Sequence, residues 1–463
     1  MPELPEVETV VRILNTFVPN KTIKDIIVYR EKSIPLPVSE FKNALIGETF
    51  LPTTRIGKHI IFHLTNNKVI VSHLRMEGKY FESSVDAAPD KHDILCYQFT
   101  DGSALRFNDV RKFGTTDLRT EENYRTTLPL SKVGKEPWDI TAKELKEAFK
   151  NKSNTIKESL LDQTIMCGLG NIYVDEVLFA TNIHPKTPAN TVSIKKLENV
   201  ISESRRILED AIECGGSTIR SYHPKEGMDG RMQNQLLAYG HSNEPCPKCG
   251  MIMRKIEVGG RGTTYCPKCQ KREGYPFIVG VTGRIGAGKS SVTKYLKDKG
   301  YKVLDADKIV HDLYKTPSVV DELTKAFGKK TAENGVINHG VLLSIVSDNK
   351  EKKETLEKIV HFHVYKEMFE VIRSGKYKKI VLDVPLLLNG PLENECDLII
   401  YVDTPEKIRM ERIAKRGKDV KKAIALNKGW PSARAKAVAG ITIDGSGSLE
   451  DLEKQLDSKI NIL

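Results

Sequence analysis

Long apolar segments and targeting signals are what this sequence lacks. No run of residues approaches the roughly 18 consecutive apolar residues of a membrane-spanning helix. The start at Met1 is followed by neither a basic segment nor an apolar core of the kind that directs secretion. We therefore expect a cytoplasmic protein with no membrane partner.

Neither half of the chain has a strong excess of charge of one sign. The net charge of +11 permits an anionic partner without identifying one. Residues 1–274 carry 39 Lys and Arg against 35 Asp and Glu, and the remainder carries 33 against 26. Individual residues must therefore identify any nucleic-acid site. With 463 residues, 39% of them hydrophobic, the chain is long and apolar enough for two domains or more.

Cysteine is scarce, and half of it is clustered. Four of the eight cysteines are scattered, and the other four form two CxxC pairs separated by sixteen residues. Four thiolates at this spacing predict a closed, structural zinc site, and they suit a reducing compartment. A redox role for the pairs is the alternative. The predicted zinc ligands are Cys246, Cys249, Cys266 and Cys269.

A glycine-rich loop begins fourteen residues after the cluster ends. It follows an apolar run over 277–282 and precedes a helical pattern over 291–296, which is the context of a phosphate-binding loop. In such a loop Lys289 would reach the β- and γ-phosphates, and Ser290 would bind Mg²⁺. We expect ATP there, but the loop does not specify a reaction. The loop reads Gly283-Arg284-Ile285-Gly286-Ala287-Gly288-Lys289-Ser290-Ser291.

Acidic residues follow the strands that we expect after this loop. The segment 303–307 is predicted to be a second strand that ends in two acids, of which Asp307 can accept a hydroxyl proton. Further strands are expected at 380–387 and 398–403. A basic helical face then follows, which is either a solvated helix or a cationic lid over ATP. Its residues are Arg409, Arg412, Lys415 and Arg416.

The N-terminus carries a second chemical signal. Removal of Met1 would expose the secondary amine of Pro2, and an α-amino group titrates roughly two to three units below a lysine. More of it is therefore an unprotonated nucleophile near neutral pH, with Glu3 beside it as a proton donor. The alternative for the following residues, 5–8, is an ordinary helix start.

Further patterns lie between the N-terminus and the end of the cysteine cluster. Segments 60–64 and 69–74 alternate like strands around an Asn66-Asn67 turn, and a helical pattern starts near Ala142. Bases lie beside Phe113, and with Met76 this set could fill a gap in a base stack, although core packing is the alternative. The turn over 168–171 either approaches a phosphate or simply joins two helices. A hairpin between the CxxC pairs would carry Arg261 at its tip.

Residues 1–273 closely resemble formamidopyrimidine-DNA glycosylase along their whole length. The matching segments are Pro2–Thr9, Arg55–Lys58, His73–Gly78, Asp109–Gly114, Gly168–Glu176 and the zinc finger with Arg261. The resemblance implies a multidomain fold. Residues 1–130 would form an N-terminal β-sandwich, 131–235 a helix-two-turn-helix domain and 236–273 the zinc finger, with damaged double-stranded DNA in the cleft.

The resemblance also implies roles in removing oxidised purines. Pro2 would attack C1′ of the flipped nucleotide, Glu3 would act as general acid, and β,δ-elimination would cut the strand. Residues 217–235 would cap the lesion, and oxidised pyrimidines are the rival substrate. Lys58 and Arg261, together with Asn171, would hold phosphates. The remaining DNA-binding residues implied are His73, Met76, Arg111 and Phe113.

Residues 277–463 resemble dephospho-coenzyme A kinase, with a parallel α/β sheet and a phosphate-binding loop. The segments that carry the resemblance are the glycine-rich loop and residues 305–307, 335–338, 359–361, 383–387, 404–412 and 445–450. The resemblance implies ATP- and Mg²⁺-dependent phosphorylation of the 3′-hydroxyl of dephospho-CoA, with Asp307 as base and Lys289 stabilising charge. Departures from the family pattern occur at His339, Phe362, Leu388-Asn389, Arg416 to Asn427, Gly440 and Gly445.

The leading hypothesis is thus a bifunctional, monomeric enzyme with a structural zinc ion. The first alternative is an active glycosylase with an impaired or regulatory ATP-binding tail. The second is a non-catalytic DNA-damage-binding protein, against which Pro2, Glu3 and Lys58 argue. Nothing in the sequence indicates that the two halves communicate.

Overall fold

The computed structural model describes residues 2–217, 231–347, 349–385, 387–417, 419–427 and 429–460. The chain divides into two compact units, and each is considered by itself. The first contains residues 1–240 and 258–263, and the second contains residues 241–257 and 264–463. No helix among the described residues is long and apolar enough to span a membrane.

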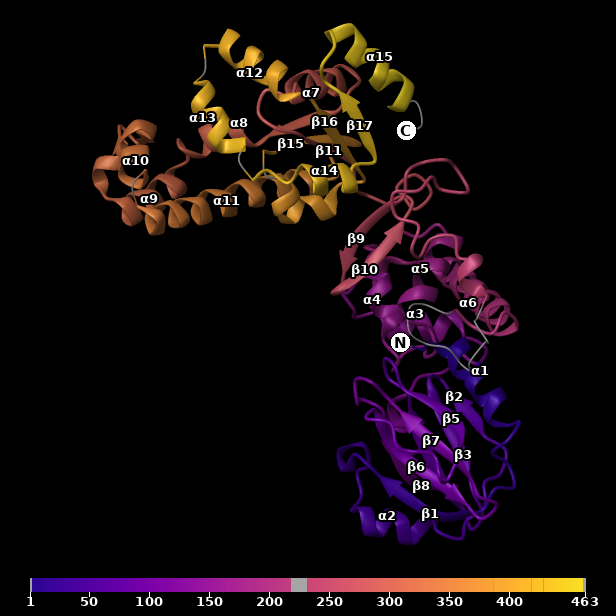
Figure 1. Cartoon of the computed structure of the whole chain (residues 1–463). Helices are drawn as coiled ribbons and strands as arrows, with labels where there is room; N and C mark the ends of the chain where they lie inside the picture. The colour runs from indigo at the N-terminus through magenta and orange to yellow at the C-terminus, as the bar shows by residue number, and fades with distance from the viewer. Residues whose placement is uncertain are drawn as a thin grey trace. The chain divides into compact units, whose positions relative to one another are not determined.

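Two four-stranded antiparallel sheets form the amino-terminal part of the first unit (Figure 1). Their strand orders are β1-β6-β7-β5 and β2-β3-β4-β8. The predicted hairpin is present as β3 and β4, and Asn66 and Asn67 both adopt positive φ between them. The elements are α1 (Leu4–Leu14), β1 (Ile23–Val28), α2 (Val38–Leu45), β2 (Thr54–Ile56), β3 (His59–His63), β4 (Lys68–His73), β5 (Lys79–Ser84), β6 (Asp93–Phe99), β7 (Ser103–Asn108) and β8 (Thr115–Thr120).

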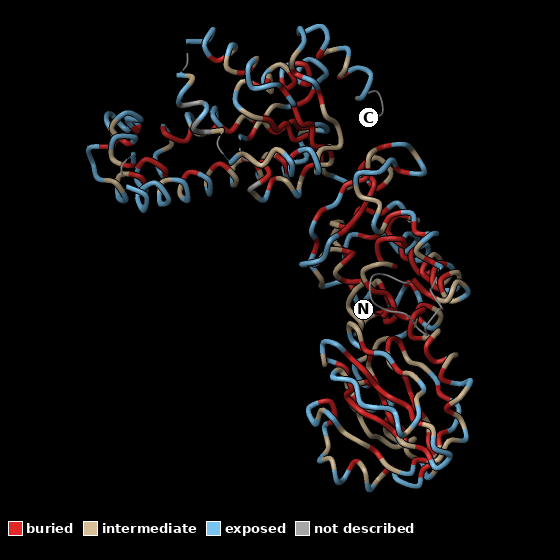
Figure 2. Tube along the Cα trace, in the orientation of Figure 1, coloured by how far each residue is buried: buried red, intermediate tan, exposed pale blue. Residues whose placement is uncertain are grey.

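Helix α1 joins this sheet core to a helical core. Val7 and Val10 pack with residues of both sheets, whereas Leu4 packs among the helices that follow. The interiors of both cores appear as buried segments in Figure 2. Burying one helix in two cores fixes its start, and therefore Glu3, relative to the helices. These are α3 (Ala142–Phe149), α4 (Ile156–Leu161), α5 (Asn171–Ala180) and α6 (Ile194–Glu213).

The second unit is built on a five-stranded parallel sheet in the order β12-β15-β11-β16-β17. The central strands are buried almost throughout, as apolar runs in parallel sheets require. The predicted strand 303–307 is shorter than expected. It ends at Asp305, whose side chain accepts a hydrogen bond from Lys308 N, so Asp307 belongs to the first turn of α8.

Helices surround this sheet, and α11 is the longest (Figure 1). The elements are β11 (Phe277–Thr282), α7 (Lys289–Asp298), β12 (Lys302–Asp305), α8 (Ala306–Leu313), α9 (Pro317–Phe327), β13 (Ala332–Glu333), β14 (Val336–Ile337), α10 (His339–Val346), α11 (Lys350–Arg373), β15 (Lys379–Asp383), β16 (Leu398–Asp403), α12 (Glu406–Lys415), α13 (Val420–Asn427), α14 (Ser432–Val438), β17 (Ile441–Asp444) and α15 (Leu449–Ile460).

The cysteine-bearing residues pack against this α/β core within the second unit. Arg254 of β9 (Arg254–Val258) is 3% exposed, and its guanidinium donates to the carbonyls of Val438 (2.9 Å), Glu393 (3.3 Å) and Cys396 (3.4 Å). Three carbonyls thus share one buried cation. The strand pairs with β10 (Arg261–Tyr265), so one hairpin contributes residues to both compact units.

Replacing Arg254 by Ala should loosen the packing of the finger on the α/β core. The change removes a donor that three buried or partly buried carbonyls share, and we expect a loss of roughly 2 kcal/mol in the free energy of unfolding. Amide hydrogen exchange should accelerate in the segment 437–440 of the full chain. Lys255→Ala is the matched control because Lys255 is the exposed neighbour on the same strand. Equal exchange in both variants would contradict the assigned role of Arg254.

Candidate active sites

Glu3 lies at the amino end of helix α5, far away in the sequence. Its carboxylate accepts hydrogen bonds from Gly170 N (2.6 Å) and Ile172 N (2.9 Å). The glycines of the predicted turn make this approach possible. A Cβ on Gly170 would lie 2.2 Å from Glu3 Cδ, and Gly168 has a φ of +104°. The turn therefore brings backbone amides to a carboxylate, a contact that neither interpretation of the turn had anticipated.

The electrostatics of Glu3 follow from this burial. Glu3 is 3% exposed, and desolvation raises the pKa of its carboxyl to about 7, although Lys58 and the helix amides act in the opposite direction. The negative charge of Glu6 also raises the pKa of Glu3. A carboxyl with such a pKa can hold and release a proton near neutral pH. Pro2 is buried directly before it in the chain.

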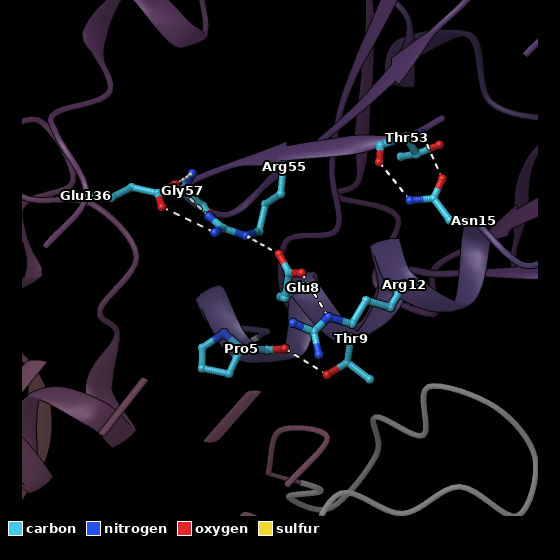
Figure 3. A network of polar contacts seen from close by, with 9 residues as sticks. All are labelled: Pro5, Glu8, Thr9, Arg12, Asn15, Thr53, Arg55, Gly57 and Glu136. Carbon is cyan, nitrogen blue, oxygen red and sulfur yellow. Dashed lines mark hydrogen bonds and ion pairs between the residues drawn. The ribbon is translucent and has the colours of Figure 1, made fainter. Parts of the chain in front are cut away.

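Lys58 is buried in the same region. Its ammonium donates to Leu169 O at 2.7 Å, and burial lowers its pKa, while Glu3 and Glu6 raise it. The ion pair that holds the preceding residues is drawn in Figure 3. Arg55 contacts both carboxylate oxygens of Glu136 at 2.6 and 3.2 Å, and Gly57 N donates to the same group. Arg55 thus positions the loop that carries Lys58.

A second anchor near Glu3 was not predicted from the sequence. Tyr173 on α5 donates its hydroxyl hydrogen to Glu6 at 2.6 Å, and Ser217 N donates to the same oxygen. Ser217 begins the predicted lesion-capping segment, of which residues 218–230 lie outside the described part of the chain. Glu6 therefore joins the helix start to α5 and to the beginning of that segment.

Arg261 and Asn171 are brought to the same place. Asn171 opens α5, and its side-chain amide donates to Gly262 O at 3.1 Å. Below the hairpin tip, Lys157 is fully buried and contacts Asp175 at 2.6 Å and Thr263 at 2.7 Å. The sequence around Lys157 and Asp175 is an ordinary helical pattern, and it did not indicate this buried pair. The pair holds the tip with Arg261 against α4 and α5.

The predicted gap-filling residues lie on two loops at one end of a sheet. His73 ends β4 and pairs with Thr115, the first residue of β8, so the turn with half-buried Met76 and the loop 109–114 leave the same edge. Phe113 is 54% exposed, and the Arg111 guanidinium lies 5.1 Å from its ring centre. An apolar ring this exposed is not core, which favours the contact role over the packing alternative.

Two buried groups support these loops. Asp109 is fully buried, and its carboxylate accepts hydrogen bonds from the backbone N–H groups of Arg111, Phe113 and Gly114. His73 accepts one from Arg75 N through Nδ1 at 2.9 Å, and burial together with the neighbouring His59 lowers its pKa to about 2. His73 is thus a neutral support for its turn.

The four cysteine sulfurs of the predicted zinc cluster all lie within 4.8 Å of one another. This spacing fits tetrahedral coordination by four thiolates with no open position, which is a structural site. Zinc would hold together the two chain segments on which Arg254 and the hairpin are built.

The glycine-rich loop of the second unit connects β11 to α7. Gly286 and Gly288 adopt φ of +84° and +105°, and a Cβ on Gly286 would lie 2.9 Å from Arg409 O. Lys289 donates to Gly283 O at 2.9 Å, and burial lowers its pKa. Asp383, at the end of β15, attracts this ammonium and accepts a hydrogen bond from Thr293. Asp383 was missing from the predicted site residues.

Asp307 lines a cavity of about 450 Å³ between α8 and the β13–β14 hairpin region. His339, one of the departures from the family pattern, lines the same cavity. Gly445, another departure, has no room for a side chain because its Cβ would lie 2.5 Å from Ala287 O. Phe362 is 63% exposed on α11.

The interpretation of Arg409 as part of an exposed basic face is wrong. Arg409 is 1% exposed, and its guanidinium donates to Thr404 O at 3.2 Å and Ile285 O at 3.3 Å. Through its contact with Ile285 O, Arg409 supports the glycine-rich loop. Arg412 donates to Gly447 O at 3.2 Å, and Asn427, within the segment that departs from the family pattern, accepts from Ile285 N.

The comparisons with known proteins divide the chain at the same junction. Residues 1–116 match the formamidopyrimidine-DNA glycosylase N-terminal domain, and 133–223 match the H2TH domain of that family. Residues 243–272 match the zinc finger found in FPG and IleRS, and 277–451 match dephospho-CoA kinase.

Individual relatives agree over the first part. The formamidopyrimidine-DNA glycosylase of an Exiguobacterium species is 49% identical over 276 residues, which are 59% of this chain and all of that protein. The Bacillus subtilis enzyme is 45% identical over 277 residues and is also covered completely.

Solved structures of Lactococcus lactis Fpg, with DNA containing N7-benzyl-Fapy-dG or an abasic site, are 39% identical. They cover 58% of this chain and all of that protein, with a TM-score of 0.55. With the buried Glu3, the cysteine cluster and these matches together, the chain belongs to the formamidopyrimidine-DNA glycosylase family and carries a dephospho-CoA kinase domain after its zinc finger.

Proposed function

We propose that the first part of the chain removes oxidised purines from double-stranded DNA and cuts the strand. With Met1 removed, the Pro2 nitrogen forms a bond to C1′ of the flipped nucleotide and loses its proton as the bond from C1′ to the damaged base breaks. Glu3 then gives a proton to the ring oxygen, the bond between C1′ and that oxygen breaks, and the bond from Pro2 to C1′ becomes an iminium. Successive β- and δ-elimination then release the two strand ends. The observation that carries this proposal is the buried Glu3 carboxyl, whose pKa of about 7 suits proton transfer.

The surrounding residues would position the DNA for this step. Asn171 and Arg261 lie at one place because the hairpin tip is tied to α5, and both can donate to phosphates. Lys58 would add a cation beside Glu3. Phe113 and Arg111, both exposed, and the half-buried Met76 would occupy the space of the flipped nucleotide. The similar Lactococcus lactis structures contain Fapy-dG and abasic-site DNA, which supports damaged DNA as the partner.

We further propose that the second unit transfers the γ-phosphate of ATP to the 3′-hydroxyl of dephospho-CoA. The cavity beside Asp307 supports this assignment, since its volume of about 450 Å³ falls in the usual range for ligand sites. Asp307 would accept the hydroxyl proton, Lys289 would stabilise the transferred charge, and Ser290 would bind Mg²⁺. Asp383 would keep Lys289 oriented.

A second candidate for this unit is nucleotide binding without transfer. The observation that favours it is the engagement of Arg409 and Arg412 in carbonyl contacts, because a lid needs cations that can reach phosphate. ATP binding without formation of CoA would select this candidate.

Borohydride trapping tests the nucleophile. The full chain and an 8-oxoguanine duplex should give a covalent adduct, and Pro2→Gly should reduce its yield by at least about tenfold, because the glycine changes the nucleophilic amine. Intact-protein mass should show that Met1 is absent from the reactive protein. An adduct of undiminished yield in the variant would exclude Pro2 as the nucleophile.

The pH profile tests Glu3. Because its pKa is raised to about 7, the carboxyl is protonated below that pH, and single-turnover strand cutting should slow as the pH rises through about 7. Glu3→Gln removes the titrating proton, and we expect a rate about 10²–10⁴-fold lower without this alkaline limb. Glu40→Gln, on the exposed face of α2, is the control. An unchanged alkaline limb in Glu3→Gln would assign the titration to another group.

Asp307→Asn tests the kinase assignment. We expect the rate of CoA formation to fall by about 10²–10⁴-fold, since the acceptor hydroxyl loses its base, while ATP affinity stays the same. Asp312→Asn is a matched control because Asp312 is exposed on the same helix and does not line the cavity. Phosphorylation of dephospho-CoA by labelled ATP is the measurement. Equal rates in both variants would remove Asp307 from the mechanism.

A further inference from the structure

A cavity lies where the second CxxC pair meets the α/β core, away from both sites described above. It has a volume of about 240 Å³. Its walls come from the end of the zinc finger, the segment leading to β11, and the starts of β11 and β15, all within the second unit. We call it the seam cavity. Its lining residues are Pro267, Lys268, Lys271, Arg272, Tyr275, Pro276, Phe277, Tyr301, Lys378, Lys379 and Asp397.

Sheet topology separates the seam cavity from the glycine-rich loop. Strand β11 starts at Phe277, which lines the cavity, and ends at Thr282, directly before the loop. All strands of this sheet are parallel, so their starts lie at one edge and their ends at the other. The cavity is therefore at the edge opposite the proposed ATP site, and the cavity beside Asp307 shares no lining residue with it.

The lining is strongly cationic. Four lysines and one arginine line the seam cavity, against the single carboxylate of Asp397. That carboxylate already accepts hydrogen bonds from Ile278 N at 2.9 Å and from the Tyr265 hydroxyl at 3.3 Å. Arg272 is paired with Glu395 at 3.1 Å. Lys271, Lys378 and Lys379 are exposed lysines around the same cavity, which creates a positive potential there.

Two tyrosine rings form part of the walls, and each lies near a cation. The Arg272 guanidinium lies 3.4 Å from the ring centre of Tyr275, and the Lys379 ammonium lies 5.1 Å from that of Tyr301. Flat rings beside cations suit a ligand that combines a planar group with negative charge.

Two of the lining residues carry a buried polar atom with no hydrogen-bond partner within the described structure. The Tyr301 side chain is 4% exposed, and its hydroxyl oxygen makes no hydrogen bond within the described structure. Arg272 Nε is likewise buried without a partner. Both atoms are covered by protein, so the groups that face the cavity are the lysines and the tyrosine rings.

We propose that the seam cavity binds a small phosphate-bearing molecule, up to about the size of a mononucleotide. Lys271 and Lys379 would contact the phosphate, and the tyrosine rings would form the wall beside a planar group. Phosphate fits better than a single carboxylate because several donors converge and phosphate offers more oxygens to them. The volume of about 240 Å³ suits a free small molecule, whereas a nucleic-acid backbone needs an extended surface. This site does not depend on either proposed activity.

Isothermal titration of the zinc-loaded full chain with inorganic pyrophosphate, and separately with AMP, tests the proposal. The double variant Lys271→Ala/Lys379→Ala should weaken binding at one class of sites by about tenfold or more, since two charge-assisted contacts are lost. Any binding at the glycine-rich loop is common to all proteins compared, so the difference reports the seam cavity. Lys352→Ala/Lys353→Ala, an equal charge change on exposed α11, should bind like the unaltered chain.

Tyr275→Ala separates a specific contact from general charge. It removes one ring of the cavity wall and leaves the net charge unchanged, so AMP, which carries a planar base, should bind several-fold more weakly, while pyrophosphate binding should change little. Identical isotherms for the unaltered chain, the double lysine variant and Tyr275→Ala would overturn the proposal. If the lysine variant weakens only the binding of an undamaged DNA duplex, the ligand is a nucleic-acid backbone, and the proposal of a small molecule is wrong.

Discussion

The contact between Glu3 and the start of α5 is the constraint on which the first unit depends. The carboxylate replaces the partners that the first amides of a helix lack, and it ties residue 3 to residues 170–172. Helix α1 begins immediately after Glu3 and is buried in both cores. The position of the helix therefore holds Glu3 at the start of α5, and the Glu3 contact in turn holds the start of α1. Gly170 permits the approach, since any side chain there would occupy the place of the carboxylate. One interaction thus closes the unit and creates an acid with a raised pKa. Structural and chemical demands on Glu3 therefore cannot be separated by substitution alone, which is why a pH profile is informative.

The second unit uses a cation in a comparable way. Arg409 is buried behind the glycine-rich loop, donates to Ile285 O and has its own carbonyl close to Gly286. A loop with several glycines would otherwise sample many conformations. The helix α12 thus acts as a support for the loop, and the lack of space at Gly445 belongs to the same close packing. A departure from a family pattern can therefore reflect local packing, and it need not indicate lost binding.

Local patterns carried much of the prediction. The hairpin around Asn66-Asn67, the helix from Ala142, the strand 398–403 and the cysteine cluster follow from short-range alternation, turn chemistry or ligand spacing, and each is present. The family resemblance is confirmed for both parts of the chain. What the sequence could not supply are partners distant in the chain. In the sequence, Lys157, Arg254 and Arg409 look like ordinary surface residues. Only the tertiary structure brings them to the partners that bury them. The order of the parallel strands could not be predicted either, because it also depends on contacts between residues distant in the chain.

The β9–β10 hairpin, whose residues are divided between the two compact units, has a consequence for modularity. In sequence, the polar segment before Phe277 looks like a place where two genes could be joined or separated at will. In the folded chain the finger contributes Arg254 to the interior of the α/β unit and Arg261 to the other unit. A fragment ending after the finger would expose a guanidinium that has lost its carbonyls, and the complementary fragment would expose those carbonyls. The junction is thus a shared structural part, and a cut after the finger would divide contacts that hold the α/β unit together.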